Sequence, residues 1–150
     1  MVVKVHKPRV FIDADVIFAG AAAPSEHGSS HVILRMGELT LLDCITSEQA
    51  IAEVERNLTE KLPAKLPEFR LLVSRCLRVI PDPLPDDLPS YADQADPKDL
   101  PLFVSAIREN CAYLITFNVR HYCPKPNSIN VQKPGDFILT VRQLLGQLKE

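Results

Sequence analysis

The stretch "RVFIDADVIF", residues 9–18, runs a short apolar strand directly into two aspartates before apolar residues resume. Residues 9–12 are typical of a buried strand, and burying a carboxylate without a partner costs free energy. An acid between Ile12 and Val16 therefore indicates a functional position at the end of a strand. Asp13 is the first candidate, and Asp15 is expected either to share its role or to hold it in place.

Size and composition predict one globular domain over residues 1–150, since 46% of the residues are hydrophobic and 24% are charged. No apolar run approaches the ~20 residues of a membrane span. The N-terminal "MVVKVHKPR" is short and charged compared with a secretory signal, so a cytoplasmic protein is expected. The net charge of −2 argues against a basic nucleic-acid clamp but permits an acidic enzyme that meets phosphates through metal ions.

Strand and helix patterns alternate along the chain, which predicts an α/β fold with a mostly parallel central sheet and helices on both faces. Thr46 and Gln49 have the spacing of a capping box at the start of one helix. Pro-rich and acidic residues 81–97 predict a loop. Strands are expected at 9–12, 39–44, 77–80, 112–116 and 129–131, and helices at 31–39, 46–62, 66–77, 99–110 and 133–150. The last helix is expected to turn inward Phe137, Val141, Leu144, Leu145 and Leu148.

Ligands of an open parallel sheet bind outside the carboxyl ends of its strands, and several polar residues of this chain are expected there. Asp13 and Asp15 follow the first strand, and Glu53 lies in the second turn of the helix after the second strand. The remaining candidates precede a later helix or follow the fourth strand: Asp96, Asp99, Thr116 and Asn118. These residues could meet at one edge of the sheet.

This order of residues resembles the PIN-domain nucleases over nearly the whole chain, and most closely the subgroup that contains toxin ribonucleases of type II toxin-antitoxin pairs. The segments that carry the resemblance are "VFIDADVIF", "SEQAIAEVERNL", "DPKDLPLFVSAI", "YLITFNVRHY" and "VQKPGDFI". The resemblance implies a three-layer α/β/α domain and an endoribonuclease that depends on Mg²⁺ or Mn²⁺.

The resemblance also implies roles for individual residues. Asp13, Glu53 and Asp99 are expected to bind the metal and act in catalysis, and carboxylate oxygens suit Mg²⁺ and Mn²⁺. Many family members carry an aspartate where this chain has Asn118, so Asp96 is expected to supply the missing charge. Asp15, Thr116 and Asn118 are expected to support the site.

The implied partners are an RNA substrate, a second copy of the chain in a homodimer, and a small antitoxin protein. A peptide of the antitoxin is expected to enter the acidic site or to lie across the first two helices. Basic side chains of such a peptide would be attracted to the clustered acids.

Two other functions compete with this interpretation. A phospho-receiver domain would use Asp82 as the acceptor with the pair Lys133–Pro134, but it leaves Glu53 and Asp99 unexplained. A non-catalytic PIN-like module would bind RNA or protein, with Asn118 marking loss of the site. His121 and Cys123 form no usual zinc spacing, and a solvated loop is the preferred interpretation of residues 120–121.

Overall fold

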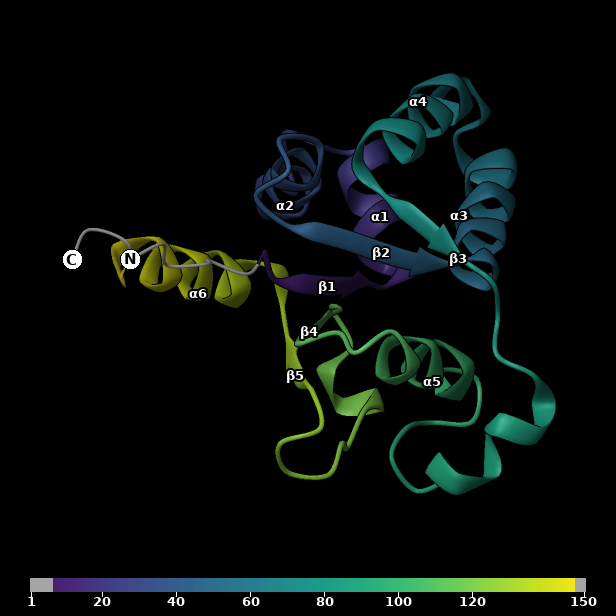
Figure 1. Ribbon diagram of the computed structural model, residues 1–150. Coiled ribbons are helices and arrows are strands. Elements are labelled where there is room, and N and C mark those ends of the chain that lie inside the picture. Colours follow the sequence, from purple (N-terminus) through teal and green to yellow (C-terminus); the bar gives the residue numbers. More distant parts are fainter. Residues whose placement is uncertain (1–6, 148–150) are drawn as a thin grey trace.

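A computed structural model describes residues 7–147, and a parallel sheet of five strands lies at its centre (Figure 1). The strand order is β3-β2-β1-β4-β5. Val10 of the central strand pairs with Cys44 on one side and Tyr113 on the other. The strands are β1 (Arg9–Ile12), β2 (Asp43–Ser47), β3 (Arg78–Ile80), β4 (Tyr113–Ile115) and β5 (Asn130–Gln132). The predicted parallel sheet is confirmed.

Helices cover both faces of the sheet, as predicted. The connections from β1 through β2 to β3 step in one direction, and right-handed crossovers then place their helices on one face. The chain steps back across the sheet to reach β4, so α5 lies on the opposite face (Figure 1). The helices are α1 (Ala14–Ala22), α2 (Gly28–Glu38), α3 (Glu48–Lys61), α4 (Leu66–Cys76), α5 (Leu100–Arg108) and α6 (Pro134–Gly146).

The central strand β1 explains why the opening stretch decides the fold. Val10, Phe11 and Ile12 are completely buried, because β1 has a strand on each side and helices over both faces. A parallel strand in this position needs apolar side chains on both faces rather than an alternating pattern. The strand therefore delivers Asp13 to the middle of the carboxyl edge of the sheet.

The helix α1 was not predicted. Asp13 ends the strand and its side chain accepts a hydrogen bond from the amide of Ala14, so strand passes into helix without an intervening loop. The sequence did not reveal the passage from strand to helix, because a short apolar segment fits a strand and a buried helix equally well.

Three further details differ from the predictions. The second strand begins at Asp43 because residues 39–42 form a turn in which Thr40 has a φ of 63°. The side chain that caps α3 is Ser47, which accepts from the amide of Ala50, whereas Thr46 donates to the carbonyl of Ile12. Leu145 is 44% exposed rather than turned inward, and Leu148 lies outside the described residues.

The long connection between β3 and α5 contains two single turns of 3₁₀-helix, Pro85–Asp87 and Pro89–Tyr91, and is otherwise irregular. This agrees with the predicted loop. Within residues 7–147, no helix combines the length and apolar character that crossing a membrane requires.

Candidate metal centre

Asp13 lies at the end of β1 and is the most deeply buried of the candidate acids, with 7% of the residue exposed. One carboxylate oxygen accepts from the amide of Ala14 at 2.6 Å, and the other accepts from the Tyr122 hydroxyl at 3.0 Å. Burial raises the pKa of the Asp13 carboxyl, and the negative charge of Asp99 raises it further. Asp13 and Asp99 therefore share one electrostatic neighbourhood.

Asp15 lies in the first turn of α1 and connects this helix to the segment that follows β4. Its Oδ2 atom accepts from the Phe117 amide at 3.0 Å, the Asn118 side-chain amide at 3.1 Å and the Thr116 hydroxyl at 3.3 Å. Its Oδ1 atom is buried and has no hydrogen-bond partner among the described residues. Burial and the charge of Asp13 raise the pKa of Asp15 to about 7. The unpartnered oxygen is suited to a cation.

Asp99 immediately precedes α5, at the position of its N-cap residue. In the part of the chain that the structure describes, no capping hydrogen bond to this side chain occurs. Its Oδ2 atom instead lies 3.0 Å from Nδ1 of His121, and Oδ2 of Asp96 lies 3.9 Å from Nε2 of the same ring. Asp96, Asp99 and His121 each offer one ligand atom within 4.8 Å of the others, which is close to the reach of one ion.

Backbone pairing holds this cluster together across the fold. Ala95 and Tyr122 form an isolated antiparallel bridge, and the amide of Asp96 donates to the carbonyl of His121 at 2.8 Å. The neighbouring side chains of His121 and Tyr122 therefore hydrogen-bond different acids. The imidazole of His121 bonds to Asp99, and the hydroxyl of Tyr122 donates to Asp13. Burial and the nearby charges of Asp13 and Asp99 raise the pKa of the Tyr122 hydroxyl, which keeps it a proton donor.

Glu53 lies on α3, away from this cluster but beside Asp15. The two acids line a pocket of about 170 Å³ between α1 and α3, together with Ala14, Phe18, Asn57 and Lys61. Among residues 7–147, the group that one ion could bridge contains neither Glu53 nor Asp13. The predicted acids thus form two adjoining groups, Asp96 with Asp99 and Asp15 with Glu53, and Asp13 is electrostatically coupled to Asp99 and Asp15.

His121 and Tyr122 are the site residues that sequence reasoning missed. His121 was assigned to a solvated loop, and the pairing that turns it toward Asp99 joins segments 27 residues apart at Ala95 and Tyr122. A hydrophobic pattern does not report such a contact. The signal in the sequence that could have indicated these site residues was the pair His121–Tyr122 close after Asn118, of which Tyr122 is buried.

The donor set fits a divalent cation. Hard cations take oxygen ligands, and the described cluster offers the half-exposed carboxylate of Asp96 and the largely buried carboxylate of Asp99, while the unpartnered oxygen of Asp15 lies in the adjoining group. Clustered carboxylates repel one another, as the raised pKa values of Asp13 and Asp15 indicate. A bound cation would relieve that repulsion.

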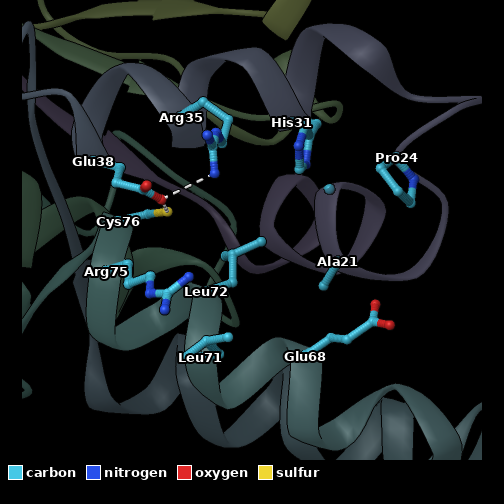
Figure 2. A pocket seen from close by; sticks show the side chains of 11 residues that line it. Ala21, Pro24, His31, Arg35, Glu38, Glu68, Leu71, Leu72, Arg75 and Cys76 are labelled. Atoms are coloured by element: carbon cyan, nitrogen blue, oxygen red, sulfur yellow. Dashed lines mark hydrogen bonds and ion pairs between the residues drawn. The ribbon is translucent and has the colours of Figure 1, made fainter.

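A separate hollow of about 190 Å³ lies between α1, α2 and α4 (Figure 2). Figure 2 shows Ala21 and Leu72 beside the hollow and charged side chains around it. Arg35 pairs with Glu38 at 3.2 Å, and both come from α2. The hollow combines an apolar lining with charges of both signs, which suits a peptide more than a small ion.

The phospho-receiver alternative does not fit this topology. Asp82 follows the edge strand β3, and β2 separates that strand from β1 and Asp13. Asp82 accepts a hydrogen bond from the amide of Gln49 at 2.9 Å, so it fastens the start of α3. The acids that a receiver would need to bring together are therefore apart.

Comparisons with known proteins agree with the fold. A family model described as a PIN domain matches residues 9–120. The solved structure of VapBC2 from Rickettsia felis bound to a DNA fragment from its promoter contains a similar chain, with a TM-score of 0.60 and 16% identity. The alignment covers 83% of this chain and 98% of that one.

Mycobacterium tuberculosis VapC20, described as a toxin that cleaves the sarcin-ricin loop, is similar with a TM-score of 0.51 and 14% identity. The alignment covers 79% of this chain and 92% of that one. No curated protein matches the sequence in a comparison of sequences. At these identities, the two solved structures support the fold.

Proposed function

The chain belongs to the PIN domain family, and on this basis we propose that it is a metal-dependent endoribonuclease that hydrolyses RNA phosphodiester bonds. The observation that carries the proposal is the gathering of Asp13, Asp15, Asp96 and Asp99 at the carboxyl end of the sheet. Ligands of parallel α/β sheets bind at this edge. Of the predicted metal ligands, we propose that Asp96 and Asp99 bind the ion directly, that Asp13 positions it through its charge, and that Glu53 contributes from the adjoining group with Asp15.

In the proposed reaction, the residues of the site have different roles. A bound Mg²⁺ or Mn²⁺ would neutralise charge on the phosphate and activate water for an in-line displacement. Asp99 and Asp96 offer carboxylate oxygens to the ion, and Asp13 adds a charge held in a buried, low-dielectric position. Asp15 fixes Thr116 and Asn118 through its hydrogen bonds and so shapes the wall of the site.

Basic side chains next to the acids favour a polyanionic substrate. Arg120 and Lys133 line a pocket of about 200 Å³ together with Asn118 and His121. Lys61 lies on the other side, in the pocket that contains Asp15 and Glu53. Cations on both flanks of a carboxylate cluster would hold a phosphate backbone across it, which supports RNA as the substrate.

We further propose that the chain is the toxin of a toxin-antitoxin pair and forms a homodimer in the cytoplasm. The support for the toxin assignment is the similarity in fold to VapBC2, which is described as bound to DNA from its promoter, and to VapC20, which is described as a toxin that cleaves the sarcin-ricin loop. The hollow between α1, α2 and α4 is the surface that we assign to an antitoxin peptide. Its apolar lining would take leucine-like side chains, and the charges around it would fix the direction of the peptide.

The test is cleavage of single-stranded RNA by the purified full chain with Mn²⁺, with Mg²⁺ and with EDTA. We expect cleavage with either ion and none with EDTA. The substitution Asp13→Asn should lower the cleavage rate by about a hundredfold or more, because it removes a charge that positions the metal. Asp86→Asn is the matched control, since Asp86 is exposed in the loop after β3.

Two outcomes would contradict the proposal. Cleavage that persists in EDTA would remove the metal from the reaction. An RNA that binds with measurable affinity and stays intact with either ion would favour the non-catalytic module, in which Asn118 marks a lost acid.

A further inference from the structure

His121 lies between the carboxylates of Asp96 and Asp99, which precede α5. His121 itself belongs to the 3₁₀ turn Val119–His121, which follows β4. We propose that His121 is a nitrogen ligand of the cation held by Asp96 and Asp99, and that this centre selects a transition-metal dication such as Mn²⁺ over Mg²⁺. The inference rests on the proposed metal-dependent function and specifies the ion that serves it.

The distances in the cluster are those of a ligand set. Metal bonds of about 2.1 Å place two neighbouring donors about 3 Å apart. Oδ2 of Asp99 and Nδ1 of His121 are 3.0 Å apart, which matches this separation. Asp96 is farther, at 3.9 Å from Nε2, but its side chain is 51% exposed and has room to move inward.

Each ring nitrogen faces a carboxylate, so the ring is oriented whichever nitrogen binds the ion. If Nε2 binds beside Asp96, Nδ1 donates to Asp99, and the reverse holds if Nδ1 binds beside Asp99. Histidine ligands in metal centres commonly donate their second nitrogen to a carboxylate, which fixes the tautomer and the ring plane. The arrangement around His121 has this form.

The backbone holds the imidazole in place independently of any ion. The amide of Asp96 donates to the carbonyl of His121, and the amide of Cys123 donates to the carbonyl of Gln94 at 2.7 Å. Gln94 is buried, and its side-chain oxygen accepts from the amide of Lys125. These bonds hold residues 121–125 against the segment before α5. A loop histidine that is merely solvated needs no such anchoring.

An imidazole changes the preference of the site. Mg²⁺ takes oxygen ligands almost entirely, whereas imidazole nitrogen is a good ligand for first-row transition metals. A site made of carboxylates alone would accept Mg²⁺ and Mn²⁺ alike. Two carboxylates with one imidazole shift that preference toward the transition metal.

The experiment uses Mn²⁺ itself as the probe, on the full chain and without RNA. Electron spin echo envelope modulation of the Mn²⁺-bound protein should show a directly coupled ¹⁴N nucleus. The signal should be lost in His121→Gln and kept in His31→Gln, because His31 lines the separate hollow between α1, α2 and α4. Calorimetric titration should show Mn²⁺ affinity falling about tenfold or more in His121→Gln, a loss typical of metal-site residues. Mg²⁺ affinity should change much less.

Several results would overturn the inference: a wild-type Mn²⁺ complex without ¹⁴N coupling, equal Mn²⁺ affinity in His121→Gln, or no Mn²⁺ binding. The first and last are read on the wild-type chain, so they hold even if a variant folds poorly. RNA cleavage is scored separately. Cleavage with Mg²⁺ and no ¹⁴N signal would reject His121 as a ligand and keep the proposed function. A ¹⁴N signal without cleavage would keep His121 as a ligand and reject the proposed function.

Discussion

At the scale of single residues, the two acids of the opening stretch have different surroundings. Asp13 uses both carboxylate oxygens in hydrogen bonds to Ala14 and Tyr122. Asp15 has one oxygen bonded to the segment after β4 and one buried oxygen that is unpartnered within residues 7–147. Sequence could place both acids at the strand end, but it could not show which oxygens are occupied, because all of the partners except Ala14 come from residues 116–122, about a hundred positions away.

The raised pKa of Asp15 predicts how the metal-free protein responds to pH. Asp15 has an ordinary pKa of 3.8 and a pKa of about 7 in the fold. Between these values the folded state binds more protons than the unfolded state, so the free energy of unfolding falls as pH rises from about 4 to 7. The raised pKa of Asp13 acts in the same direction.

The variant Asp15→Asn should therefore raise the melting temperature at pH 8 in EDTA and flatten its dependence on pH. The gain is roughly a few kcal/mol at most, since one pKa unit corresponds to about 1.4 kcal/mol. Thermal melts from pH 5 to pH 8 check this, with Asp86→Asn as the exposed control. If the melting temperature of Asp15→Asn depends on pH as steeply as that of the wild type, Asp15 is not the group that titrates.

At the scale of elements, helix α3 shows where sequence patterns succeed and where they stop. The helix was predicted over residues 46–62 and is observed at Glu48–Lys61, with Val54 and Leu58 buried. The capping box of Thr46 and Gln49 was wrong, because β2 continues to Ser47 and directs Thr46 to the carbonyl of Ile12. The register of a strand decides which side chain reaches the helix, and that register is set by pairing with β1.

Loss of the observed cap gives a direct test. Ser47→Ala should lower the free energy of unfolding by about 1 kcal/mol, the usual cost of removing an N-cap side chain. Gln49→Ala is the matched control and should leave it nearly unchanged, because the observed role of Gln49 is that of its backbone amide, which donates to Asp82. Chemical denaturation measures both. Equal losses in the two variants would restore the capping box that the sequence suggested.

The helix α1 and the cluster around His121 mark the limits of prediction for the site. The parallel sheet with helices on both faces followed from the alternation of strand and helix patterns along the chain. The position of His121 depends on an antiparallel bridge between Ala95 and Tyr122, which joins two irregular segments. Irregular pairing has no periodic signature, so this part of the site emerged only from the structure.

At the scale of the whole molecule, the fold brings acids from three segments toward one edge of one sheet. The central strand supplies Asp13, α1 supplies Asp15, and the long loop before α5 supplies Asp96 and Asp99. The charge of Asp13 raises the pKa of Asp15, and the charge of Asp99 raises that of Asp13. The carboxylates therefore repel one another in the folded protein, and a bound divalent cation would offset this repulsion.

The most direct measurement is anomalous diffraction from crystals of the full chain soaked in Mn²⁺. The account predicts one strong anomalous peak within bonding distance of Asp99, at the carboxyl end of the sheet, and its loss in Asp99→Asn. A crystal with ordered carboxylates and no peak at this edge would contradict the account. A peak confined to Asp82 or Asp86, which are exposed in the first part of the loop after β3, would contradict it equally.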